Sequence, residues 1–173
     1  MKPIAIIGLC AFVAACAGTA SEAPSGPSAT AVLHDANGQE RARATVTQVG
    51  GDLHVRVTSV DMAPGTYGAH IHAVGRCEAP GFTTAGPHWN PTRRQHGKDN
   101  PQGMHMGDLP NLVVGADGKG DVDYTVAGAT LRDGDQALLA ANGASVIIHA
   151  GPDDYKTDPS GNSGARMACG VLG

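Results

Sequence analysis

Two histidines separated by a single residue are the first feature of the sequence that could do chemistry. His70 and His72 lie in a segment whose residue types are typical of a β-strand. Because strand side chains alternate between the two faces of a sheet, both imidazoles lie on one face and could bind the same metal ion. The pair alone is weak evidence, since two surface histidines give the same pattern. The other ligand-type residues therefore decide the question.

Further residues of ligand type predict a second metal position next to the first. Three histidines and one aspartate follow in a single long segment: His88, His96, His105 and Asp108. Three imidazoles and one carboxylate form the kind of closed four-ligand set that holds structural zinc. His149, at the end of a later apolar segment, then remains with His70 and His72 to bind another metal. We assign no role to the two other histidines, His34 and His54.

The segments that must position these side chains read as short β-strands. Aromatic residues make up only 3% of the chain, which also contains 25 glycines and 11 prolines, a composition that favours a β protein with long loops. Alternating or apolar stretches, separated by turn residues such as Asn37-Gly38, predict strands at 30–33, 42–47, 53–58, 67–72, 111–114, 121–126, 145–149 and 167–172. The expected fold class is all-β: an eight-stranded antiparallel Greek-key β-barrel or sandwich.

Two stretches are too rich in glycine, proline and charge to be strands. Residues 73–110, the first loop, and residues 150–165, the second loop, are both bounded by histidines. Loops this long in a compact domain are usually functional or disordered. Because ligand-type residues lie in or beside them, we expect both loops to be functional.

The N-terminus reads as a targeting segment. Lys2 precedes an apolar run that is too short for the roughly 20 residues of a membrane-spanning helix. The sequence VAAC at 13–16 is similar to a bacterial lipoprotein signal, in which the cysteine becomes the acylated first residue. We expect a periplasmic or cell-envelope protein that is lipid-anchored through Cys16, with cleavage elsewhere as the alternative. The chain then divides into a signal peptide (1–15), a flexible linker (16–28) and one domain (29–173).

Cysteine usage and charge limit the compartment and the partners. Cys77 and Cys169 are the only cysteines outside the leader, and such a pair in an exported chain is more often a disulfide than a metal site. The formal net charge of −4 argues against nucleic acid as a partner. It leaves room for a small anionic substrate, since a few local positive charges can dominate a cleft. The sequence does not distinguish a monomer from a homodimer.

Four segments resemble motifs of the copper/zinc superoxide dismutase family, and of its bacterial members in particular. They are GAHIH at 68–72, AGPHWNP at 85–91, HMGDL at 105–109 and GARMACGV at 164–171. The resemblance extends over the whole expected domain. It implies that copper is held by His70, His72, His88 and His149, and that zinc is held by His88, His96, His105 and Asp108. His88 would then bridge the two metals.

The resemblance also implies an activity. A copper that cycles between Cu(II) and Cu(I), bridged through His88 to a structural Zn(II), would disproportionate superoxide to oxygen and hydrogen peroxide and so protect the cell envelope. Arg166 matches the arginine that attracts the anion. Asp153 matches the carboxylate that links His70 to His96, and Asp154 is the neighbouring alternative. A non-enzymatic copper-binding or copper-buffering envelope protein on the same barrel is the competing hypothesis, against which Arg166 argues.

Overall fold

Residues 24–173 are described by the computed structural model, so the predicted signal peptide and Cys16 lie outside the described residues. No helix within residues 24–173 is long and apolar enough to cross a membrane. Regular structure in this range is almost entirely β-strand, as predicted. The elements are β1 (Ser28–Asp35), β2 (Glu40–Val49), β3 (Asp52–Ser59), β4 (Gly65–Tyr67), β5 (Ala69–His72), a 3-10 helix η1 (Thr83–Ala85), β6 (Leu112–Val114), β7 (Asp121–Val126), β8 (Ser145–His149) and β9 (Arg166–Val171).

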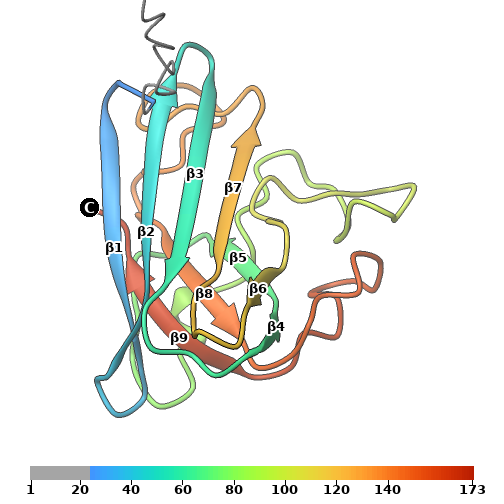
Figure 1. The fold of residues 1–173 in the computed structure, drawn as a ribbon. Helices are drawn as coiled ribbons and strands as arrows, with labels where there is room; N and C mark the ends of the chain where they lie inside the picture. Colours follow the sequence, from blue (N-terminus) through green and yellow to red (C-terminus); the bar gives the residue numbers. More distant parts are fainter. Residues whose placement is uncertain (1–23) are drawn as a thin grey trace, which may run out of the picture.

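Seven strands form one antiparallel sheet in the order β5-β8-β9-β1-β2-β3-β7, and β4 pairs with β6 in a second, two-stranded sheet. In Figure 1, β1, β2, β3 and β7 form the front layer and β5, β8 and β9 cross behind it. Strands that are distant in the chain, such as β1 and β9, are neighbours in the sheet, as Greek-key connections require. The predicted fold class is therefore confirmed.

Strand β8 is buried on both faces, which makes it a rigid support for the residue that ends it. Val146 and Ile148 point into the barrel core. Ile147 points to the other face, where it packs against Phe82 and Cys169 under the first loop. Such burial on both faces explains why this segment is a continuous apolar run rather than an alternating one.

The stretch 67–72, predicted as one strand, is divided by Gly68 into β4 and β5. The Gly68 N–H donates to the Gly151 carbonyl at 2.8 Å, and the Gly68 carbonyl accepts the main-chain N–H of His149 at 2.8 Å. A Cβ atom at Gly68 would lie 2.8 Å from the Cβ of Ser163. The absence of a side chain therefore lets the second loop approach this edge of the sheet closely, and nine strands result where eight were expected.

Both predicted loops are present and extend from the same side of the barrel (Figure 1). A third long connection, residues 127–144 between β7 and β8, was not predicted from the sequence. It contributes Asp135, Ala137 and Ala140 to the wall of the cleft that the first two loops border. Three loops, rather than two, therefore border the cleft into which the histidines open.

Candidate metal centre

Seven buried residues with metal-binding side chains meet where β5, β8 and the first loop come together. They are His70, His72, His88, His96, His105, Asp108 and His149. One ligand atom from each of His70, His72, His88 and His149 lies within 4.8 Å of the others, and the same holds for His70, His88, His96 and Asp108. The two groups adjoin, because His70 and His88 belong to both.

Four of these histidines share an unusual feature, a buried ring nitrogen with no hydrogen-bond partner. The atoms are Nδ1 of His70 and Nε2 of His72, His88 and His149. An unsatisfied buried polar atom costs about 1–3 kcal/mol, so four such atoms close together are not expected without a compensating ligand. Four imidazole nitrogens are a donor set that suits copper. The residues of this group thus fit a bound copper ion.

The second ring nitrogen of each of these four histidines has a partner that fixes the ring. His72 Nδ1 lies 2.8 Å from the Gly86 carbonyl, and His149 Nδ1 lies 3.1 Å from the Gly164 carbonyl. His70 Nε2 is 2.7 Å from Asp153 and His88 Nδ1 is 2.8 Å from Asp108. Partners of this kind set the tautomer and orientation of a ligand histidine. The four unpaired nitrogens are therefore held in place before any metal binds.

Asp108 is the centre of the second group. Its Oδ1 atom lies 2.8 Å from Nδ1 of His88, 3.0 Å from Nδ1 of His96 and 3.1 Å from Nδ1 of His105. Its Oδ2 atom accepts the main-chain N–H groups of Gly97 and His105 at 2.9 and 3.0 Å. Three imidazole nitrogens around one carboxylate oxygen form a closed donor set that fits zinc.

His105 and His70 compete for the fourth place in this second group. His70, and not His105, is the residue with a ligand atom within 4.8 Å of those of His88, His96 and Asp108. However, the free nitrogen of His70, Nδ1, belongs to the four unpaired nitrogens of the first group, whereas Nδ1 of His105 lies 3.1 Å from Oδ1 of Asp108. The hydrogen-bond geometry therefore favours His105, the residue expected from the sequence.

Asp153 connects the two groups through both of its carboxylate oxygens. Oδ2 lies 2.7 Å from Nε2 of His70, and Oδ1 lies 2.9 Å from Nε2 of His96. The neighbouring Asp154 is exposed and accepts hydrogen bonds within its own loop, from Thr157 and Asn162 among others. The link between the histidines is thus made by Asp153 rather than by Asp154.

Burial and charge shift the pKa of His96 in the opposite direction to the pKa values of His70, His72 and His149 in the metal-free protein. Burial lowers the pKa of His70 to about 3, of His72 to about 2 and of His149 to about 4. These rings are neutral at pH 7, the state that metal ligation requires. Burial also disfavours the charge of His96, but hydrogen bonds to Asp108 and Asp153 outweigh it and raise the pKa of that ring to about 9. His96 therefore favours its protonated form at neutral pH in the metal-free protein, and a bound metal would compete with that proton.

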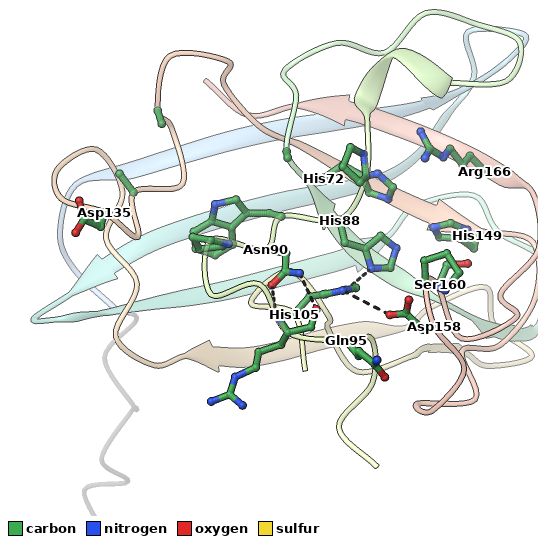
Figure 2. Close-up of a pocket in the computed structure, with 18 of the residues that line it drawn as sticks. His72, His88, Asn90, Gln95, His105, Asp135, His149, Asp158, Ser160 and Arg166 are labelled. Atoms are coloured by element: carbon green, nitrogen blue, oxygen red, sulfur yellow. Dashed lines mark hydrogen bonds and ion pairs between the residues drawn. The ribbon is translucent and has the colours of Figure 1, made fainter. Parts of the chain in front are cut away.

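Arg166 is held beside the first group by two main-chain carbonyls. Its Nη1 donates to the Phe82 carbonyl and its Nη2 to the Gly86 carbonyl, both at 2.7 Å. Arg166, His72, His88 and His149 line one cleft of about 1000 Å³, and Figure 2 shows them facing it together. Because Gly86 also accepts from His72, the guanidinium is fixed relative to a ring of the first group.

The predicted disulfide between Cys77 and Cys169 is present, with a Cα–Cα distance of 5.6 Å. Both cysteines pack with Phe82 and Ala85 against Ile147 of β8. The segment that carries the Phe82 and Gly86 carbonyls is therefore tied to the sheet. The disulfide thus supports the placement of Arg166 as well as the stability of the fold.

A barrel with two adjoining groups of metal-binding side chains, beside a cleft that a fixed arginine lines, defines a metal-dependent β-barrel protein. The family model described as "Copper/zinc superoxide dismutase (SODC)" matches residues 40–172, and the chain belongs to this family of oxidoreductases, which use copper and zinc.

Individual relatives agree with the family assignment. The chain is 47% identical over 125 residues to superoxide dismutase-like protein YojM of Bacillus subtilis, covering 71% of this chain but only 63% of that protein. It is 38% identical over 148 residues to superoxide dismutase [Cu-Zn] of Caulobacter vibrioides, covering 84% and 85% of the two chains. The crystal structure of a SOD-like protein from Bacillus subtilis superimposes with a TM-score of 0.77 at 38% identity and covers 83% and 97% of the two chains.

Sequence reasoning missed the main-chain partners of this centre. The carbonyls of Phe82, Gly86 and Gly164 fix Arg166, His72 and His149, as described above. Every residue has such a carbonyl, so no pattern in the sequence could have singled these out. The histidines outside the centre behave as expected: His34 is exposed, and His54 pairs with Asp123 on the surface of β3.

Proposed function

We propose that the chain is a superoxide dismutase that converts two superoxide ions and two protons into oxygen and hydrogen peroxide. The observation that most supports this proposal is the set of four converging, buried and unpaired ring nitrogens, which adjoins a second set arranged around Asp108. The two sets share His88, whose ring offers one nitrogen to each.

The proposed assignment gives copper the unpaired nitrogens of the first group: His70, His72, His88 and His149. Zinc is assigned to Nδ1 of His88, His96 and His105 and to Oδ1 of Asp108. Bound copper would supply one-electron oxidation and reduction, and bound zinc a fixed positive charge. The donor types and their burial support this division.

The residues of the chain account for how the anion is bound and where a proton is held. Arg166 presents a fixed guanidinium in the cleft, and a planar cation of this kind attracts and docks a small anion. His88 lines the same cleft, and its Nδ1 is held by Asp108. Its Nε2, the nitrogen assigned to copper, could hold a proton for the product only while it is not bound to the metal.

Replacing Arg166 with methionine should slow superoxide decay by about tenfold, because the local positive charge that raises the encounter rate is lost. Small anions should also inhibit the variant less. Copper and zinc content should not change, since the guanidinium contacts only carbonyls. Stopped-flow decay of superoxide, together with metal analysis, measures all three properties.

The same experiment separates an enzyme from a copper buffer. Arg56→Met removes an equal charge from an exposed position of β3 and should leave the rate unchanged. A protein that only stores copper would not accelerate superoxide decay in wild type or in either variant. Accelerated decay that is equal in Arg166→Met and wild type would contradict the proposed role of Arg166 instead.

Gly161 should be required for the link between Asp153 and His96. A Cβ atom at this position would overlap Oδ1 of Asp153 and lie 2.7 Å from Nε2 of His96. Replacing Gly161 with alanine should therefore weaken zinc binding by about tenfold, the loss expected when a residue that hydrogen-bonds to a metal ligand, here Asp153, is displaced. Competition against a chelating dye on copper-free protein measures the affinity.

Backbone strain must be separated from this effect, since Gly161 has a φ of 63°. Gly50→Ala is the matched control: Gly50 has a φ of 60° and no heavy atom within 4 Å of its added Cβ. Equal zinc affinities for the two alanine variants would show that the contact with Asp153 and His96 is unimportant.

We further propose that the enzyme works outside the cytoplasm, in the cell envelope. The Cys77–Cys169 disulfide supports this location, because disulfides persist mainly in oxidising compartments. Lipid attachment through Cys16, and the division into signal peptide, linker and domain, remain part of the proposal. Labelling of the full chain with a radioactive fatty acid, in wild type and Cys16→Ser, would test the anchor.

A further inference from the structure

A carboxylate of the second loop other than Asp153 also contacts the histidines around Asp108. Oδ1 of Asp158 accepts the main-chain N–H of His96 at 2.7 Å. The same oxygen lies 4.0 Å from Nε2 of His105, and Figure 2 shows Asp158 beside His105 at the cleft. About half of the Asp158 side chain is exposed (49%). Asp158 thus lies between two histidines of the second group while remaining accessible from the cleft.

The loop around Asp158 is fixed against the first loop, so this contact is built into the fold. The Tyr155 carbonyl accepts the main-chain N–H of Asp99 at 2.9 Å. The Lys156 carbonyl accepts from Nδ2 of Asn100 at 3.2 Å. These bonds place residues 155–158 alongside residues 96–100. The bond from the His96 N–H to Asp158 is a third contact between the same two segments.

His96 is consequently held at both ends. Asp108 and Asp153 bind the two nitrogens of its ring, and Asp158 binds its main-chain N–H. The main-chain N–H groups on either side are also bonded, that of Gln95 to the Gln102 carbonyl and that of Gly97 to Asp108. The contact with Asp158 adds a bond at His96 itself, the residue from which the ring extends. A ligand held in this way loses less freedom when it binds a metal.

We propose that Asp158 is a positioning residue for the metal bound around Asp108: it anchors the main chain of His96 and thereby strengthens zinc binding. This inference rests on the proposed function, because it assumes that zinc occupies the group formed by His88, His96, His105 and Asp108. Asp158 would contact neither the metal nor the substrate.

The test measures zinc affinity on copper-free protein with zinc alone as the probe, by competition against a chelating dye. Asp158→Ala removes the acceptor and should weaken zinc binding by about tenfold. Asp158→Asn keeps an oxygen acceptor for the His96 N–H and should bind zinc within about threefold of wild type. Cobalt(II) substituted for zinc adds a spectroscopic readout: its visible bands should shift in Asp158→Ala and not in Asp158→Asn.

Asp135→Ala serves as the matched control, since Asp135 is an exposed carboxylate lining the same cleft, away from the histidines in Figure 2. This control should leave zinc affinity and the cobalt bands unchanged. Wild-type affinity and bands in Asp158→Ala would overturn the inference, and so would an Asp158→Asn variant as weak as Asp158→Ala. If wild type itself fails to bind one zinc per chain, the proposed function fails instead.

Discussion

Replacing Asp108 with alanine should release zinc and lower the free energy of unfolding by about 3–5 kcal/mol, the cost of breaking a buried charged pair. One oxygen of this carboxylate is within 3.1 Å of the Nδ1 atoms of His88, His96 and His105. The other accepts two main-chain N–H groups of the first loop, from Gly97 and His105. The variant therefore loses a proposed zinc ligand and an anchor of the loop together.

Zinc content and chemical denaturation of the metal-free protein measure the two parts of this effect separately. Asp117→Ala is the control, because Asp117 also caps a main-chain N–H, that of Lys119, but in an exposed turn distant from the histidines. It should keep its zinc and change the free energy of unfolding by less than about 1 kcal/mol. An Asp108→Ala variant that still holds one zinc per chain would refute the ligand assignment.

Replacing His149 with alanine should remove copper and leave zinc in place. Dismutation should fall by at least about 100-fold, which is more than we expect when a residue that only hydrogen-bonds to a metal ligand is removed. His149 belongs only to the group of unpaired nitrogens, and its other ring nitrogen contacts a carbonyl of the second loop. It makes no hydrogen bond to Asp108 or Asp153, so the second group should remain intact. Metal analysis and superoxide decay on the same sample measure both effects.

His34→Ala is the control for loss of a histidine from this barrel, since His34 is exposed on β1. Copper content and activity should equal those of wild type. The assignment of His149 to copper would be wrong if His149→Ala retained full activity, or if it lost zinc and copper equally.

Part of the proposed ligand set could be predicted from residue type and strand periodicity, whereas its division between copper and zinc followed from the resemblance to the family. His70 and His72 share a face of β5 simply because side chains alternate along a strand. His149 ends an apolar segment that is buried on both faces, a pattern that the sequence displays directly. The strands, the fold class and the disulfide could likewise be read from alternation, turn residues and cysteine count.

Features that depend on contacts between distant segments could not be predicted. Gly68 divides a predicted strand because the second loop approaches it, and nothing near Gly68 in the sequence reports that contact. The connection at 127–144 buries Leu131 and Leu138 in the core, and it also contributes Asp135 to the wall of the cleft. Its place at the cleft depends on contacts that no local pattern reports. Asp158 looks like an ordinary loop aspartate until the fold brings it to His96.

The most direct test of the proposed dismutase is the decay of superoxide in the presence of protein that contains one copper and one zinc per chain. We predict that decay accelerates in proportion to the protein concentration and yields one oxygen and one hydrogen peroxide for every two superoxide ions. Zinc-only protein should show no acceleration. If the fully metal-loaded protein were no faster than the zinc-only protein, the proposed dismutase activity would be contradicted.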